Sequence, residues 1–184
     1  MSQEPASSTS FTEKDFYLRE FRARHLAIAV PAADLRAPAP LREVLAELNA
    51  NGTRVVLIST ERSAVETLTS GHVLSAATPR LEAVVWRSLR ENPVLGLVVG
   101  GSFAFAPACR EVALRLRCSK LVWIDRDGGL LRAPGDRLSF VHLDELRKLL
   151  AAADTPFRQR RLALLREVES MLDVGLPRPA QQTK

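Results

Sequence analysis

The sequence predicts an α/β fold, a three-layer sandwich in which helices cover both faces of a mainly parallel central sheet. Two observations lead to this class. Short continuous apolar runs, typical of strands buried on both faces, occur at residues 26–30, 55–58, 94–99 and 121–124. Segments with apolar residues at helical spacing separate these runs, and such alternation favours parallel pairing. With 184 residues, 46% of them hydrophobic and 26% charged, the chain can form one domain with a substantial core.

The first half of the chain alternates between helices and strands. Residues 1–11 are mostly polar, without an apolar period, and are expected to form a disordered tail. Thr12 and Asp15 resemble a capping box, which predicts a short helix over residues 12–22. A second helix follows the strand at 26–30 and ends at Asn51-Gly52. Its apolar face is predicted from the spacing of Leu41, Val44, Leu45 and Leu48. After the strand at 55–58, a helix beginning near residue 61 and a loop over residues 71–78 are expected.

The second half continues the alternation. A helix is predicted from the spacing of Leu81, Val84, Val85 and Leu89. It ends near residue 92, before the strand at 94–99. A helix near residues 107–118 leads into residues 121–124, which we expect to be a buried central strand. A short helix at 143–150 and a last helix complete one domain of residues 12–176, and a polar tail of residues 177–184 follows. The apolar stripe of that last helix is Leu162, Leu165, Val168 and Leu172.

Two turns are candidate ligand sites because they follow predicted strands. Ligands of open α/β sheets lie outside the carboxyl ends of the strands. The two turns contain Asp125, Asp127, Gly128 and Gly129 after one strand, and Gly100 and Gly101 after another. Glycine lets a backbone approach phosphate closely, and the aspartates could bind a cation. Turn formation alone also accounts for both groups of residues.

Composition argues against several classes of protein. No apolar run approaches the length of a membrane span and no secretory signal is visible, so a cytoplasmic location is expected. Cys109 and Cys118 are expected to pack as small apolar groups, and the three histidines lack the spacing of a metal site. The net charge is +5. A basic cluster stands at Arg158, Arg160, Arg161 and Arg166. Because no aromatic residues are interleaved with it, a solvated face explains it better than a nucleic-acid surface.

A family resemblance is carried by residues 113–130. This stretch runs from Ala113 through Lys120-Leu121 to Asp125-Arg126-Asp127-Gly128-Gly129-Leu130. It resembles the amino-acid kinase family, above all acetylglutamate kinase and the kinase-like domain of N-acetylglutamate synthase. In those proteins a helix ending in Lys-Leu leads into a strand, and an acidic-Gly-Leu turn approaches the nucleotide. The likeness covers most of residues 12–175 in shortened form and implies an amino-acid-kinase-like fold.

The phosphate-binding motifs of that family are replaced in this chain. Where the family's first strand ends in Lys-x-Gly-Gly, this chain has Ala29-Val30-Pro31-Ala32. Where the second strand ends in His-Gly-Gly-Gly-Pro, it has Ile58-Ser59-Thr60-Glu61-Arg62. Proline has no N–H to donate, and a glutamate repels phosphate. No catalytic residue and no cofactor are therefore expected, ATP binding is not expected, and the chain by itself is not expected to be an enzyme. No acetyl-CoA-binding pattern is present either.

The predicted helix at 12–22 carries Phe16, Tyr17 and Phe21, an aromatic stripe that we expect to be covered by protein rather than left in water. In arginine-sensitive acetylglutamate kinases, a helix at this place interlocks subunits and contributes a tyrosine near the effector arginine. The resemblance thus implies a homo-oligomer and an arginine effector near Tyr17. Packing of the stripe on its own domain is the simpler alternative.

Three hypotheses for function follow. The first is a catalytically degenerate amino-acid-kinase-like domain, regulatory or oligomerising in N-acetylglutamate and arginine biosynthesis. The second is an active component of acetylglutamate synthesis or phosphorylation that works with a partner chain, such as an acetyltransferase. The third is an interaction module that uses its basic face.

Overall fold

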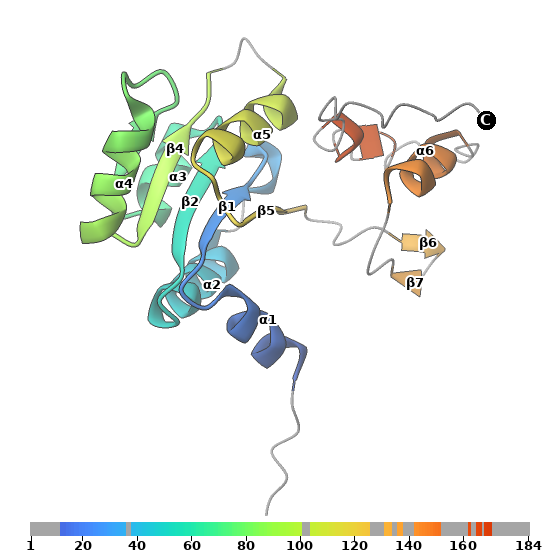
Figure 1. Ribbon diagram of the computed structural model, residues 1–184, viewed down its shortest axis with the longest axis horizontal. Helices are drawn as coiled ribbons and strands as arrows, with labels where there is room; N and C mark the ends of the chain where they lie inside the picture. The colour runs from blue at the N-terminus through green and yellow to red at the C-terminus, as the bar shows by residue number, and fades with distance from the viewer. Residues whose placement is uncertain are drawn as a thin grey trace, which may run out of the picture.

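The computed structural model describes residues 12–35, 38–100, 104–125, 131–133, 136–137 and 142–151, with residues 162, 165–166 and 168–170. Its centre is a five-stranded parallel sheet in the order β3-β4-β2-β1-β5 (Figure 1). The elements, in chain order, are α1 (Glu13–Phe21), β1 (His25–Ala29), the 3₁₀ turn η1 (Ala32–Asp34), α2 (Pro38–Ala50), β2 (Arg54–Ser59), α3 (Arg62–Leu68), β3 (Val73–Ser75), α4 (Leu81–Glu91), β4 (Val94–Val98), α5 (Phe105–Arg115), β5 (Lys120–Trp123), β6 (Leu131–Ala133), β7 (Asp136–Arg137) and α6 (Leu143–Ala151).

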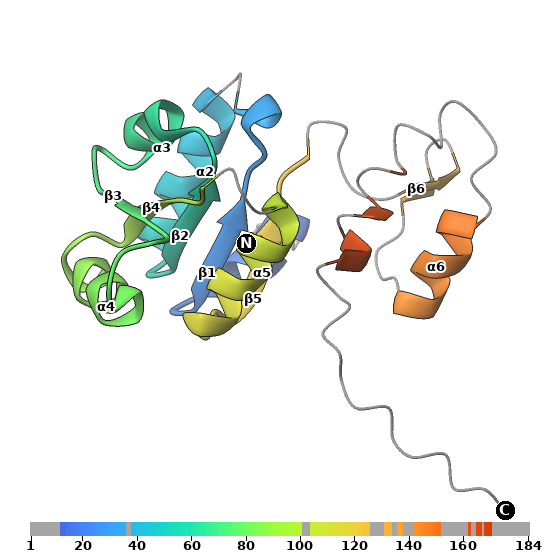
Figure 2. The ribbon, with the colours of Figure 1, turned by 90° about the horizontal axis from the view of Figure 1, so that it is seen from above.

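Helices cover both faces of the sheet, as Figure 2 shows. Helices α2 and α3 lie on one face, where α1 also packs, and α4 and α5 lie on the other. Side chains of a strand point alternately to the two faces. In β1, Leu26 and Ile28 therefore join the core under α2 and α3, whereas Ala27 and Ala29 join the core under α4 and α5. The predicted three-layer α/β fold is confirmed.

The middle of the sheet is β2, which lies between β4 and β1. Its residues Val55–Ile58 are at most 2% exposed, as expected for a parallel strand covered on both faces. In register, Ala27 of β1 lies opposite Val56, and Gly96 of β4 lies opposite Leu57. This arrangement brings the carboxyl ends of β1, β2, β4 and β5 to one edge of the sheet.

Three details of the sequence prediction were wrong. Strand β5 is not central: among the described residues it pairs with β1 alone, and its side chains are exposed or half-buried. The stretch predicted as a loop at 71–78 contains the short strand β3, which pairs with β4. On α2, Leu45 and Leu48 are buried, but Val44 is 46% exposed because it points away from the sheet.

The part of the chain after β5 contains the antiparallel pair β6–β7 and helix α6. In Figure 1 these three elements lie apart from the five-stranded sheet. The described residues of the predicted last helix are helical, and Leu165 among them is buried. Arg147 Nε on α6 donates to Glu169 Oε1 at 3.1 Å, and Arg110 Nη1 on α5 donates to the carbonyl of Ser170 at 3.3 Å. Leu172 and the predicted tails lie outside the described residues, as do all members of the basic cluster except Arg166.

Candidate functional site

The carboxyl edge of the sheet is the place where a ligand of this fold class would lie. The term carboxyl edge refers below to residues 30–35, 59–62, 99–100 and 124–125, which follow β1, β2, β4 and β5. The strand order places the ends of β2 and β1 between those of β4 and β5. The turns after β1 and β2 therefore form the centre of the edge, and the two predicted candidate turns form its sides.

The predicted candidate residues Gly100 and Asp125 lie at this edge but not together. They follow β4 and β5, which are three strand spacings apart in the sheet, or about 14 Å. Asp125 is half-buried. A methyl group added at Gly100 would meet no atom within 4 Å, so no close contact requires a glycine there. Gly101, Asp127, Gly128 and Gly129 lie outside the described residues.

Three backbone amides of the turn after β1 are used within the protein. Pro31 begins this turn and has no amide hydrogen. The amide of Val30 donates to the carbonyl of Ile58 at 2.9 Å, and the amide of Asp34 donates to the carbonyl of Pro31 at 2.9 Å. The amide of Leu35 donates to the carbonyl of Ala32 at 3.3 Å. These groups are not available to cradle an anion in the way that a glycine-rich turn does.

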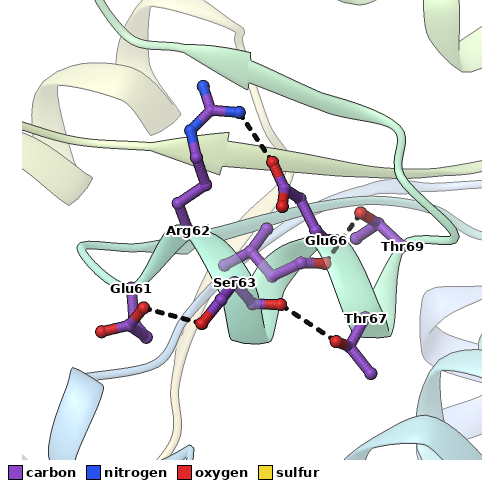
Figure 3. A network of polar contacts seen from close by, with 7 residues as sticks. Glu61, Arg62, Ser63, Glu66, Thr67 and Thr69 are labelled. Carbon is purple, nitrogen blue, oxygen red and sulfur yellow. Dashed lines mark hydrogen bonds and ion pairs between the residues drawn. The ribbon is translucent and has the colours of Figure 1, made fainter.

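Polar side chains in and after the turn that follows β2 bond to one another, as Figure 3 shows for Glu61 and Ser63. Ser59 is fully buried, and its Oγ accepts a hydrogen bond from the Glu61 amide at 3.3 Å. The Glu61 carboxylate accepts from Ser63 Oγ at 2.9 Å, across the first turn of α3. Arg62 Nη1 pairs with Glu66 Oε1 at 2.8 Å. The arginine of this turn is thus held by its own helix.

Acidic side chains follow three of the four strands at the carboxyl edge. Asp34, Glu61 and Asp125 follow β1, β2 and β5 respectively. Among the described residues of these turns, Arg62 is the only basic side chain, and it is paired with Glu66. Like charges repel, so the exposed Glu61 carboxylate works against a polyphosphate at the turn after β2. Across the described part of the chain, no group of three or more His, Cys, Asp or Glu side chains could hold a metal ion.

A cavity of about 690 Å³ opens beside the end of β4, at Val99 and Gly100, and runs along α5. Its lining is largely apolar and includes Ala76 and Ala77 from the segment before α4. Arg115 also lines it and is paired with Glu82 of α4, with 2.8 Å between Nε and Oε1. The sequence prediction missed this cavity because it depends on how the segment before α4 lies against α5, which no local pattern encodes.

The aromatic stripe of α1 is divided between core and solvent. Phe21 is half-buried against the core under α2 and α3. Phe16 and Tyr17 are 51% and 46% exposed. The rings of Phe16 and Tyr17 meet edge-on at 5.4 Å, and those of Tyr17 and Phe21 lie 5.8 Å apart. Packing on its own domain therefore holds for Phe21, whereas the oligomer and the arginine effector implied by the resemblance stay predictions.

Helix α1 is fastened firmly to the rest of the domain. The Asn51 side-chain amide donates to the carbonyl of Leu18, and Thr53 Oγ1 donates to the carbonyl of Phe21 at 2.8 Å. Lys14 Nζ lies 2.6 Å from Glu47 Oε1 of α2. The two exposed rings are thus presented on a fixed support.

The two cysteines predicted to pack as apolar groups lie in and just after helix α5. Cys109 is buried in the core under α4 and α5, and Cys118 is packed against that core; both are free thiols. Burial raises the pKa of Cys118 to about 11, so the thiol is protonated at neutral pH. Within the described residues, no helix is both long and apolar enough to cross a lipid bilayer.

Comparisons with known proteins add a structural likeness. No family model matches the chain, and no curated protein matches it significantly. A crystal structure of N-acetylglutamate synthase from Neisseria gonorrhoeae, complexed with coenzyme A and L-arginine, is similar with a TM-score of 0.57 and 15% identity. A structure of the same synthase with coenzyme A and N-acetyl-glutamate has a TM-score of 0.53 and 14% identity.

The likeness covers 84% and 87% of this chain but only 55% and 54% of the synthase chains. The chain thus spans about half the length of the proteins that it resembles. At such identities the similarity establishes the fold alone. That fold is the amino-acid-kinase-like α/β arrangement expected from the resemblance of residues 113–130.

Proposed function

We propose that the chain is a non-catalytic amino-acid-kinase-like domain with a regulatory or oligomerising role in N-acetylglutamate and arginine biosynthesis. The single observation that carries the proposal is the carboxyl edge of the sheet. Phosphoryl transfer depends on positioning and charge neutralisation by preorganised donors. At this edge Pro31 supplies no amide, the Glu61 amide is bonded to Ser59 Oγ, and Glu61 adds an exposed carboxylate.

Nucleotide binding is the direct test. A ligand present at about 100 times its Kd stabilises a protein by about 2.7 kcal/mol. For a domain of this size that corresponds to a rise in Tm of roughly 5 to 11 °C. We expect thermal unfolding to be unchanged by ATP with Mg²⁺ at millimolar concentration. A saturable rise in Tm, abolished by EDTA, would contradict the proposal and favour a working phosphotransferase.

Helix α1 supports the oligomerising role, with a second copy of the chain as the partner of Phe16 and Tyr17. Because α1 is already fastened to the domain, an interface formed there would not have to order it. We expect light scattering to give the mass of an oligomer for the native chain and a smaller mass for Phe16→Ala/Tyr17→Ala. Leu114→Ala is the matched control, because Leu114 is 59% exposed on α5. An unchanged mass in the double variant would remove this role.

L-Arginine is the effector proposed for the same helix. One of the similar synthase structures is complexed with L-arginine, and Tyr17 is the chain's only tyrosine. We expect L-arginine, but neither D-arginine nor L-lysine, to raise Tm, and Tyr17→Ala to remove the effect. Equal responses to all three amino acids would show a nonspecific ionic effect instead.

The alternative of an active component with a partner chain rests on the coverage of about half the synthase length. Mixing the chain with an acetyltransferase polypeptide would then produce acetyl transfer from acetyl-CoA to glutamate that neither gives alone. Absence of both copurification and activity would favour the non-catalytic domain.

A further inference from the structure

A second cavity lies at the end of the sheet opposite to the carboxyl edge. Its volume is about 290 Å³, and it is formed where the ends of α2 and α3 meet the start of β4. Figure 2 shows α2 and α3 next to each other on one face of the sheet. We propose that this amino-end cavity binds a small organic carboxylate, with Arg42 as the group that holds the carboxylate. The proposal is independent of the function proposed above.

The polar part of the amino-end cavity carries one cation and no carboxylate. Arg42, Asn49, Ser70, His72 and Asn92 supply its polar side chains from three different segments. In the described part of the chain, none of these five side chains makes a hydrogen bond or an ion pair. The sixth polar lining residue, the buried Thr69, differs, since its Oγ1 donates to the carbonyl of Val65 at 2.9 Å. Asn92 is half-buried and the other four side chains are exposed, so these groups bond to water in the free protein and are available to a ligand.

The remaining lining is apolar. Leu45 and Leu68 are buried and Val94 is half-buried beneath the polar side chains. A cavity of this volume corresponds to the space of about ten water molecules. A small molecule with a short hydrocarbon body and a charged end fits this division between apolar and polar lining. The planar fork of a guanidinium matches a carboxylate with two parallel hydrogen bonds.

The dipole of α2 does not oppose this assignment. The carbonyl end of a helix carries partial negative charge, but the effect falls off within the last turn. Arg42 lies in the first half of α2, two turns before its end at Ala50. The carbonyls of Glu47, Leu48 and Asn49 already accept from the amides of residues 51–53. A carboxylate at Arg42 is thus away from the negative end, whose carbonyls are largely satisfied.

The test is a titration with sodium butyrate followed by ¹H–¹⁵N NMR. We expect saturable shifts at the side-chain amides of Asn49 and Asn92 and at Arg42 Nε–H. A hydrogen-bonded charge pair of this kind corresponds to a change in affinity of about ten- to a hundredfold. Arg42→Gln should raise the Kd by at least about tenfold. Arg87→Gln is the matched control, because Arg87 is an exposed arginine on α4, on the other face of the sheet, and should leave the Kd unchanged.

Two further ligands separate the alternatives. Butyramide has the same body without the charge and should bind at least about tenfold more weakly than butyrate. Inorganic phosphate has charge without an apolar body and should also bind more weakly. The assignment would be overturned if butyramide or phosphate bound as tightly as butyrate. It would also be overturned if none of the three ligands bound, or if Arg42→Gln left the Kd of butyrate unchanged. A well-dispersed amide spectrum shows that each variant is folded. Because the two sites are separate, ATP binding at the carboxyl edge would contradict the proposed function but not this assignment.

Discussion

Gly96 of β4 is the residue at which a single methyl group should disturb the fold most clearly. A Cβ added there would lie 2.3 Å from Val65 Cγ1 and 2.9 Å from Val73 Cγ2. Val65 is fully buried on α3, so its side chain has no free space into which to move. Overpacking of a core costs about 1–3 kcal/mol, and the lower backbone entropy of unfolded alanine offsets about 0.4–1 kcal/mol of this. We expect Gly96→Ala to lower the free energy of unfolding by about 2 kcal/mol.

A double-mutant cycle tests the cause. Val65→Ala removes the clashing methyl groups and alone should cost about 2 kcal/mol, because buried methyl groups are lost and a cavity remains. Independent effects would sum to about 4 kcal/mol in Gly96→Ala/Val65→Ala. Since the new methyl group fills the space that the valine leaves, we expect a cost of only about 2 kcal/mol for the pair.

The assay is urea unfolding monitored by the fluorescence of the two tryptophans. A loss of 2 kcal/mol should lower the midpoint by roughly 1 M urea. Gly100→Ala is the matched control and should be close to neutral, because its added methyl group would meet no neighbouring atom. Additive costs in the cycle, or a neutral Gly96→Ala, would refute the close approach of α3 to β4.

Three other predictions concern the helix cap, acid stability and thiol reactivity. Thr12→Ala removes the hydroxyl that accepts a hydrogen bond from the Asp15 amide, which should cost about 1 kcal/mol of helix stability. Hydrogen exchange of the α1 amides should therefore accelerate by about fivefold. Unchanged exchange would show that the cap contributes nothing. The hydrogen bonds from Thr12 lower the pKa of Asp15, and the hydrogen bond from Arg115 lowers the pKa of Glu82. The stability that these carboxylates contribute should therefore be complete above their unfolded pKa values, near 4, and should be lost as the pH drops towards the folded values. The urea midpoint of Glu82→Gln should fall less steeply with decreasing pH than that of the native chain. Because burial raises its pKa from 9.0 to about 11, Cys118 has a thiolate fraction at pH 8 about a hundredfold lower in the native protein than in urea. It should therefore react more slowly with iodoacetamide in the native protein, and equal rates would contradict its burial.

Local pattern was sufficient for the elements whose burial is decided by their own residues. The apolar runs that became β1, β2 and β4 had to be covered on both faces, and the helical spacing of α4 placed Leu81, Val85 and Leu89 in the core. The capping box of Thr12 was also predicted and is present. These features depend on interactions within a few residues, or on burial that the composition itself requires.

Strand order was beyond such reasoning. The run at residues 121–124 has the composition of a central strand, yet β5 pairs with one neighbour among the described residues. Strand β3 has only three residues and owes its conformation to pairing with β4, more than 20 residues later. For the candidate site, the replacement of glycine by Pro31 and Ser59 could be seen in the sequence. The distance between Gly100 and Asp125, however, follows from the order of the strands.

The attachment of α1 has a consequence for biosynthesis. An isolated helix of nine residues is marginal in water, so α1 depends on the contacts that hold it. The side chain that binds the carbonyl of Leu18 comes 33 residues later, at Asn51. At a synthesis rate of about 5–20 residues per second, α1 waits roughly 2–7 s for this partner. Helix α1 is therefore fastened only after all of α2 and Asn51 have emerged, and it is an integral part of the folding unit of the sheet.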